Sequence, residues 1–276
     1  TNILDCLGPI REGGFSLLEI CSSPTHLDYH DSRTLEWTAQ RMRSLGMEAY
    51  SFHAPFAEHI DITSYDPLQR RHSEEEVLRA AEAAARLGVR YFVIHPGPEQ
   101  SRKPPPEQHL QHLRNAAEVL NRLARRCHEL GVGFVLENML PHLLFGHASD
   151  LLWLLGALGS RGVGICLDTG HAYLSSDLHT VMHKLSGHLK MVHANDNRGQ
   201  YDDHLPPGLG NIDWNQVLSH LSQGDFRGAL VLELKGDRPV EQVLEEARTA
   251  RWHLRDLMRR LDFGQTLQPA NASIPG

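Results

Sequence analysis

Short apolar runs alternate with longer amphipathic stretches along almost the whole chain. The apolar runs are rich in Val, Ile, Leu and Phe and show little alternation of apolar and polar positions. This pattern is typical of parallel strands that are covered by helices. Seven strands are predicted in this way: Phe15–Ile20, Ala49–His53, Tyr91–His95, Phe134–Glu137, Gly164–Asp168, Lys190–His193 and Ala229–Glu233.

The amphipathic segments between these strands carry the signals with which helices begin and end. Ser73 followed by Glu76, and Asp213 followed by Gln216, form capping patterns at helix starts. Gly88 follows the last turn of one predicted helix. The predicted helices are Ser32–Leu45, Ser73–Leu87, Pro106–Leu130, Ser149–Leu158, Asp177–Ser186, Asp213–Leu221 and Val240–Arg260.

The repeated order of strand and helix predicts an α/β fold of the (β/α)8 TIM barrel type, in a single domain over residues 1–264. Seven strands are one too few. We expect the eighth in Asn2–Leu7, or else a first β/α unit that is shortened or trimmed. A doubly wound open sheet is the alternative, but no glycine-rich phosphate loop follows a strand. Residues 265–276 are expected to form a flexible C-terminal tail.

Composition narrows the class of protein. Hydrophobic residues make up 41% and charged residues 22% of the 276 positions, which is ordinary for a globular chain with a substantial core. The longest apolar runs, such as Leu151–Leu158, are too short to span a membrane, and the first ten residues do not have the pattern of a signal peptide. The four cysteines form no CxxC pair, so we expect a reducing, cytoplasmic location.

The charged residues argue against a broad surface for nucleic acid. The formal net charge is −7, and the chain has only four lysines beside 19 histidines. An excess of histidine is compatible with neutral surface positions or with metal chemistry. The positions of the histidines decide between these two interpretations.

Six of the seven predicted strands end in a histidine or a carboxylate. In a barrel, the carboxyl ends of all strands meet at one face, where active sites lie. One such residue is easily explained as a hydrogen-bonded strand end, but six together indicate a common site. Imidazole and carboxylate groups are the usual protein ligands of zinc, manganese and iron. The six residues are His53, His95, Glu137, Asp168, His193 and Glu233.

Two loops add further ligand types. His171 follows Asp168 by three residues and reaches the same centre if the chain turns into a helix. Asp202 and His204 are spaced so that both side chains point the same way in an extended segment. Asp203 is the alternative partner of His204.

The sequence at this point resembles a known group of barrels. The segment from His193 to Trp214 contains an HxxD pattern followed by DxHLxxGxGxIDW, and residues 164–171 read GICLDTGH. With His53-Ala-Pro-Phe56 and His95-Pro-Gly97, these motifs are similar to those of the xylose-isomerase-like TIM barrels. That superfamily comprises sugar (phosphate) isomerases and epimerases together with endonuclease IV, of the AP endonuclease family 2. The resemblance runs from about Phe15 to about Leu261.

The isomerase and epimerase branch implies one divalent metal bound at the matching positions Glu137, Asp168, His193 and Glu233. Glu137 and Glu233 would also act as catalytic base and acid on a small carbohydrate, a sugar or sugar phosphate. The reaction would proceed by proton abstraction to a metal-stabilised enediolate. The expected metal is Mn, Zn, Mg or Co.

Further residues are expected to contact the substrate. His171 and Arg198 are the candidates for direct contacts, and Asn138 lies beside the ligand Glu137 in sequence. Lys235 and Arg238 follow the last strand, where barrels often bind phosphate, but a substrate without phosphate fits equally well.

The endonuclease branch implies three zinc ions and a phosphodiester hydrolase. Its additional ligand positions are all filled here, so one to three metal ions are compatible with the sequence: His53, His95, His171, Asp202 and His204. Other features depart from that branch, since the segment Ala-Pro-Phe-Ala-Glu-His after His53 lacks its tyrosine and asparagine. His193 is followed by Ala-Asn-Asp-Asn instead of the expected leucine and Asn-Asp-Ser-Lys. Nucleic acid is therefore the less favoured partner.

A third interpretation is a barrel that retains its ligands but serves as a binding or partner subunit. Absence of any affinity for manganese or zinc would indicate this role. The pattern predicts no membrane partner, and it leaves open whether the chain forms a homo-oligomer.

Overall fold

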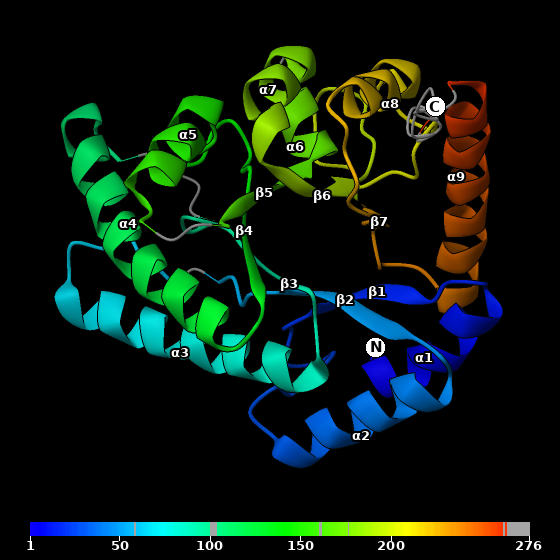
Figure 1. Ribbon diagram of the computed structural model, residues 1–276, viewed down its shortest axis with the longest axis horizontal. Coiled ribbons are helices and arrows are strands. Elements are labelled where there is room, and N and C mark those ends of the chain that lie inside the picture. The colour runs from blue at the N-terminus through cyan, green and yellow to red at the C-terminus, as the bar shows by residue number, and fades with distance from the viewer. Residues whose placement is uncertain (58, 100–103, 160–161, 176, 262, 264–276) are drawn as a thin grey trace, which may run out of the picture.

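Seven parallel strands form one sheet that curls into a barrel in the computed structural model (Figure 1). The structure describes residues 1–263 except 58, 100–103, 160–161, 176 and 262, so the predicted tail 265–276 lies outside the described residues. The strands follow chain order around the sheet, and each neighbouring pair is parallel. They are β1 (Leu17–Cys21), β2 (Glu48–His53), β3 (Tyr91–Ile94), β4 (Gly133–Glu137), β5 (Gly164–Asp168), β6 (Leu189–Ala194) and β7 (Leu230–Leu232).

Helices surround the outside of the sheet, so the predicted TIM barrel architecture is confirmed (Figure 1). The start of the helix predicted at Ser73–Leu87 was wrong. That helix begins at Pro67 with Asp66 as its N-cap, and Ser73 lies buried inside it, where its hydroxyl donates to the Gln69 carbonyl. The helices are α1 (Ile3–Glu12), α2 (Ser32–Ser44), α3 (Pro67–Leu87), α4 (Pro106–Glu129), α5 (Ala148–Ala157), α6 (Thr169–Leu174), α7 (Leu178–Leu185), α8 (Trp214–Gln223) and α9 (Val240–Arg260).

The strand expected in Asn2–Leu7 is not formed, because this segment belongs to helix α1. The side chain of Asn2 accepts a hydrogen bond from the Leu4 amide, and Ile3, Cys6 and Leu7 are buried on one helical face. In the described part of the chain, β7 and β1 are therefore the two edges of the sheet. A cavity of about 650 Å³ lies between these edges, and α9 forms its outer wall.

Alternation along the strands separates two apolar layers. Phe52, Phe92 and Phe134 occupy one row of the strand register and stack on one another, within the large cluster that also contains the helix faces. Val135 and Cys166 belong to a smaller cluster inside the barrel, together with residues of the neighbouring strands. Because side chains two residues apart share a face, positions two residues beyond this inner cluster point into the barrel mouth.

Asp196 anchors the long loop that follows β6. Its buried carboxylate accepts hydrogen bonds from the amides of Asn197, Gly208 and Ile212 and from the indole N–H of Trp214, over 2.9–3.1 Å. The Asp196 backbone also pairs with that of Leu205. These contacts explain the spacing of the DxHLxxGxGxIDW segment, since one carboxylate fixes both its middle and its end.

Gly210 lies against the same carboxylate. A Cβ atom at this position would stand 2.2 Å from Asp196 Oδ1 and 2.5 Å from the Asn197 carbonyl, both far too short for a contact. The absence of a side chain therefore allows the loop to close on Asp196. Asp202 and His204 are carried by this closed loop.

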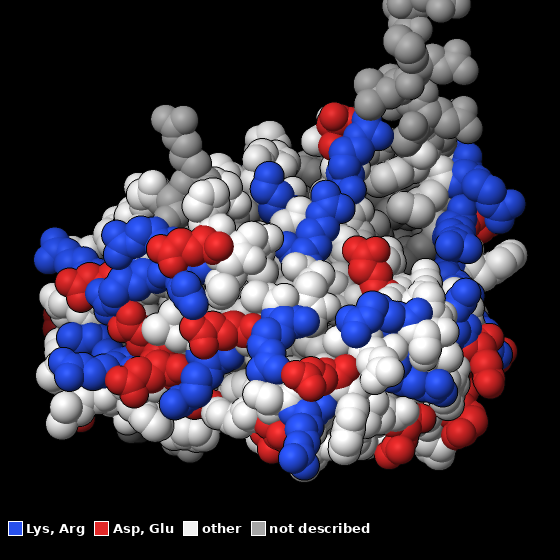
Figure 2. Space-filling view, turned by 60° about the horizontal axis from the view of Figure 1, so that its bottom comes forward, with Lys and Arg blue, Asp and Glu red and all other residues white. Residues whose placement is uncertain are grey.

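The outer surface carries both signs of charge. On the face drawn in Figure 2, Lys and Arg side chains are interspersed with Asp and Glu side chains. Ion pairs such as Arg122–Glu74 and Arg126–Glu82 join α3 and α4. None of the described helices combines the length and the apolar character that a membrane crossing requires.

We expect Asp196→Asn to lower the free energy of unfolding by about 3 kcal/mol. The NH₂ group of the new side chain would face N–H groups that now donate to the carboxylate, so those hydrogen bonds would be lost. Urea unfolding followed by circular dichroism measures this change. Asp203→Asn lies in the same loop, and the described residues give its side chain one hydrogen bond, from the Arg198 amide, so this variant should change stability by less than about 0.5 kcal/mol. Equal stability of the two variants would show that Asp196 does not anchor the loop.

Candidate active site

The strand-end residues converge at the mouth of the barrel, as the sequence predicts. Glu137, Asp168 and His193 lie two residues beyond Val135, Cys166 and Met191 of the inner cluster. The same alternation turns them inward, and all three are buried. Parallel strands thus bring side chains from distant parts of the sequence to one place.

Glu137 lies at the centre of the site. Its Oε2 atom is 3.1 Å from Nε2 of His53 and 3.4 Å from Nε2 of His95. Its Oε1 atom is 3.2 Å from Nδ1 of His193. The carboxylate is 1% exposed, so these imidazoles replace the water that would otherwise solvate its charge.

Asp168 and Glu233 complete a second group around His193. The Nδ1 atom of His193 is 3.2 Å from Glu233 Oε2, the same distance that separates it from Glu137 Oε1. Asp168 caps the short helix α6, where its Oδ1 accepts from the His171 amide, and its Oδ2 accepts from the Asn195 side chain. Glu233 follows β7 directly and is one-third exposed, so it faces the open side of the mouth.

The loop residues form a third group at the rim. Asp202 Oδ2 is 3.3 Å from His171 Nε2 and 3.0 Å from His204 Nε2, so Asp202, and not Asp203, is the partner of His204. His204 adopts a φ of 46°, in the left-handed region that side chains rarely occupy. Asp202 Oδ1 is buried and has no hydrogen-bond partner among the described residues.

Three sets made up only of these histidines and carboxylates are arranged as metal-ion ligands would be, and a fourth joins Cys166 to Glu137 and His193. In each of the three sets, one nitrogen or oxygen of every member lies within 4.8 Å of the others. The donor types suit a divalent ion, and the unpartnered Asp202 oxygen is free to bind one. The sets are His53, His95 and Glu137; Glu137, Asp168, His193 and Glu233; and His171, Asp202 and His204.

The carboxylates of the site raise the pKa values of the histidines beside them. Burial disfavours the imidazolium form, but Glu137 outweighs burial and raises the pKa of His95 to about 9. At His204, burial is likewise outweighed, chiefly by the hydrogen bond with Asp202, and the pKa rises to about 9. Burial raises the pKa of Asp168 to about 6, whereas the His193 charge overcomes burial and lowers that of Glu137. The carboxylates of the mouth therefore stabilise positive charge on the histidines that face them.

Asn138 holds two of the strand ends together. The side-chain nitrogen of Asn138 donates to the backbone carbonyl of Asp168, and its side-chain oxygen accepts from the backbone amide of Asp168. The backbone carbonyl of Asn138 accepts a hydrogen bond from His171 Nδ1. These bonds fix Asp168 and His171 in the mouth. A direct substrate contact of Asn138 stays a prediction.

The exposed Arg198 is not brought into the mouth. It lies on the anchored loop, outside the residues that line the cavity, and its backbone amide donates to Asp203. Its role in substrate binding stays a prediction.

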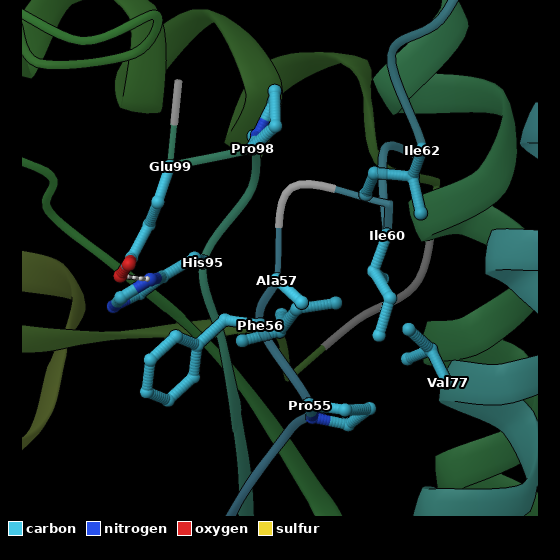
Figure 3. Close-up of a pocket in the computed structure, with 11 residues that line it drawn as sticks. Pro55, Phe56, Ala57, Ile60, Ile62, Val77, His95, Pro98 and Glu99 are labelled. Atoms are coloured by element: carbon cyan, nitrogen blue, oxygen red, sulfur yellow. Dashed lines mark ion pairs between the residues drawn. The ribbon is translucent and has the colours of Figure 1, made fainter. Parts of the chain in front are cut away.

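Two carboxylates at the site were missed in the sequence. Glu19 lies on β1, where its Oε1 is 3.0 Å from His193 Nε2. The sequence signal that could have identified it is a single carboxylate within the otherwise apolar run Leu17–Cys21. Glu99 lies in the loop after β3, with its Oε1 3.1 Å from His95 Nδ1 and the ring of Phe56 beside the pair (Figure 3). No periodic pattern marks a loop residue such as Glu99.

A cavity of about 420 Å³ opens above these groups, which is large enough for a small molecule. Its polar side comes from all three sets of ligand-type residues. Its apolar side is formed by Phe56, Met139, Leu140 and Leu143, and His142 also lines it. None of the described residues that line it is Lys or Arg.

The chain belongs to the xylose isomerase-like TIM barrel family, whose family model matches residues 9–257. This match covers the seven strands and all nine ligand-type residues. The family suggested by the sequence motifs is thereby confirmed.

Similar proteins fall into both branches of this family. A ketose 3-epimerase from Arthrobacter globiformis is 26% identical over 231 residues, covering 81% of this chain and 74% of that protein. A probable endonuclease 4 from Mycobacterium ulcerans is 26% identical over 199 residues, covering 68% and 73%. The crystal structure of a D-tagatose 3-epimerase-like protein superimposes with a TM-score of 0.79 at 25% identity, covering 90% of each chain.

We expect the protein in chelator-containing buffer to lose thermal stability between pH 6.5 and 8.5. The raised pKa values of His95 and His204 stabilise the fold fully only below the unfolded value of 6.5, and this contribution disappears as pH rises through about 9. The fall in Tm should be on the order of 5 °C, measured by differential scanning calorimetry. A double variant, His95→Gln with His204→Gln, should show a flatter profile. A flat wild-type profile would contradict these pKa shifts.

Proposed function

We propose that the protein is a divalent-metal-dependent isomerase or epimerase that acts on a sugar. The observation that carries this proposal is the set Glu137, Asp168, His193 and Glu233, in which the carboxylates of Glu137 and Glu233 meet at one nitrogen of His193 and both line a cavity. The similarity to a ketose 3-epimerase and to a D-tagatose 3-epimerase-like structure supports the same chemistry.

These four residues would hold the ion. A bound divalent ion supplies Lewis-acid polarisation of neighbouring carbonyl and hydroxyl oxygens, which acidifies the C–H bond between them. Neighbouring imidazoles lower the pKa values of Glu137 and Glu233, so both carboxylates are ionised and ready to accept a proton. The carboxylate that removes the proton can return the same proton to a neighbouring atom, which moves a carbonyl group. Inversion of the carbon centre requires that the other carboxylate first takes up a proton from water and then delivers it from the opposite face.

The other walls of the cavity would position the sugar. His171, Asp202 and His204 offer donors and acceptors for hydroxyl groups at one side. Phe56 and Leu143 offer an apolar surface for the C–H face of the ring and keep water from the carbon that loses its proton.

The charges around the cavity favour a substrate without a phosphate group. Lys235 is 60% exposed and pairs with Asp237, and Arg238 pairs with Glu246, so both side chains are engaged away from the described cavity lining. The lining is rich in carboxylates, which would repel a phosphate dianion. A neutral ketose offers only uncharged carbonyl and hydroxyl groups and fits this lining. The cytoplasmic location and a homo-oligomeric state stay predictions.

We expect Glu233→Gln to lower turnover at least 100-fold, because the amide cannot accept the substrate proton at neutral pH. Exchange of the ketose C3 proton with deuterated water, followed by NMR, measures the chemical step directly. Glu241→Gln, an exposed carboxylate in the first turn of α9, should retain wild-type exchange. Normal exchange in Glu233→Gln would remove this residue from the mechanism.

A second candidate is a zinc phosphodiester hydrolase of the endonuclease IV type. The specific observation in its favour is the presence of the two further sets, His53 with His95 and Glu137, and His171 with Asp202 and His204. Clustered zinc ions clamp the attacking and leaving oxygens of a phosphodiester. The basic residues that a nucleic acid backbone requires are absent from the described lining of the cavity.

Metal content and incision assays separate the two candidates. We expect protein purified without chelator and analysed by mass spectrometry to hold one tightly bound ion per chain, with no incision of abasic duplex DNA at low salt. Three ions together with incision that fades as salt rises would instead establish the hydrolase. A chain with no affinity for manganese or zinc would indicate the binding-subunit role.

A further inference from the structure

Glu19 meets His193 on the side of the ring that faces away from the other carboxylates. The Nε2 atom of His193 is 3.0 Å from Glu19 Oε1 and 3.1 Å from Oε2. The opposite ring nitrogen, Nδ1, is 3.2 Å from both Glu137 and Glu233. One nitrogen of the ring thus faces the proposed metal ligands and the other faces Glu19.

A metal ion binds only the ring nitrogen that carries no proton. If Nδ1 is to bind, the proton of the neutral ring must stay on Nε2, where it needs an acceptor. Glu19 is that acceptor, so its carboxylate selects the tautomer with Nδ1 free and also fixes the direction in which the ring points. Carboxylates placed behind a histidine ligand have this effect in metal sites generally.

Glu19 is itself held in position. Ser51 is its direct neighbour in the register of β1 and β2, and the Ser51 hydroxyl donates to Glu19 Oε2 over 2.6 Å. Ser51 is fully buried and the Glu19 side chain is 12% exposed. The hydroxyl fixes one carboxylate oxygen and leaves both oxygens within reach of the imidazole.

We propose that Glu19, held by Ser51, is the positioning residue that presents Nδ1 of His193 to a divalent metal ion. This role rests on the proposed metal centre, and it predicts an effect on metal affinity before any substrate is added. The alternative is a structural role, in which Glu19 only neutralises the charge of His193 in the folded core. The two roles differ because a purely structural carboxylate contributes to stability and leaves metal affinity unchanged.

The test measures Zn²⁺ affinity by competition with a chromogenic chelator. His193→Ala first identifies the binding event that depends on this histidine. Glu19→Leu, which removes the acceptor at similar volume, should weaken that event about 10- to 100-fold. Glu19→Gln keeps an acceptor oxygen and should lose less. Ser51→Ala should fall between Glu19→Gln and the wild type.

Matched controls and a second readout separate positioning from folding. Glu48→Leu and Glu48→Gln alter an exposed carboxylate at the start of β2 and should leave Zn²⁺ affinity unchanged. The absorption spectrum of bound Co²⁺ should change in Glu19→Leu, because the ligand field senses how the imidazole is oriented. Melting in chelator-containing buffer shows whether each variant is folded, and Ser51→Ala tests the inference if Glu19→Leu does not fold.

The outcomes distinguish this inference from the proposed function. Wild-type affinity and an unchanged Co²⁺ spectrum in folded Glu19 variants would overturn the positioning role and leave the metal centre intact. A wild-type chain that binds neither Zn²⁺ nor Co²⁺ would overturn the metal centre and the inference with it. Weaker binding in the order Leu, Gln, wild type would establish the role of Glu19.

Discussion

The buried charge of Glu137 is the constraint around which the site is organised. A carboxylate removed from water must be compensated by cations or by strong hydrogen-bond donors. Here the compensation comes from His53, His95 and His193, which reach it from three different strands. Glu19 and Glu233 then add negative charge around His193, so compensation by protons alone is poor. A divalent cation at Nδ1 of His193 would balance the charges of Glu137 and Glu233, while Glu19 accepts the proton on Nε2 of the same ring.

The parallel barrel makes this concentration of charge possible. Strands β4, β5 and β6 contribute Glu137, Asp168 and His193, and alternation along each strand places Val135, Cys166 and Met191 of the inner cluster two residues before them. The loop after β6 brings Asp202 and His204 to the rim because Asp196 fixes its closure. Packing inside the barrel therefore positions the strand-end residues, and anchoring of the loop positions Asp202 and His204 beside them.

The two branches of the family remain visible in one chain. The four-residue set around His193 suits the proposed proton transfer on a sugar, whereas the two outer sets match the additional ligand positions that the endonuclease branch implies. The described lining of the cavity combines an apolar side with histidines and carboxylates and includes no arginine or lysine, which supports the proposed sugar substrate. The ligand-type residues alone thus do not separate the epimerase branch from the endonuclease branch. The other residues that line the cavity do separate them.

The sequence by itself determined the alternation of strands and helices and the ligand types at strand ends, because both are local patterns with fixed periods. It did not determine the role of residues 2–7, where a 3.6-residue pattern of buried positions makes a helix, nor the start of α3 at Asp66-Pro67. Which ligands share a set, and that Glu19 lies behind His193, depend on distances between residues up to 174 positions apart. Only closure of the sheet sets those distances, so the tertiary structure alone decided them.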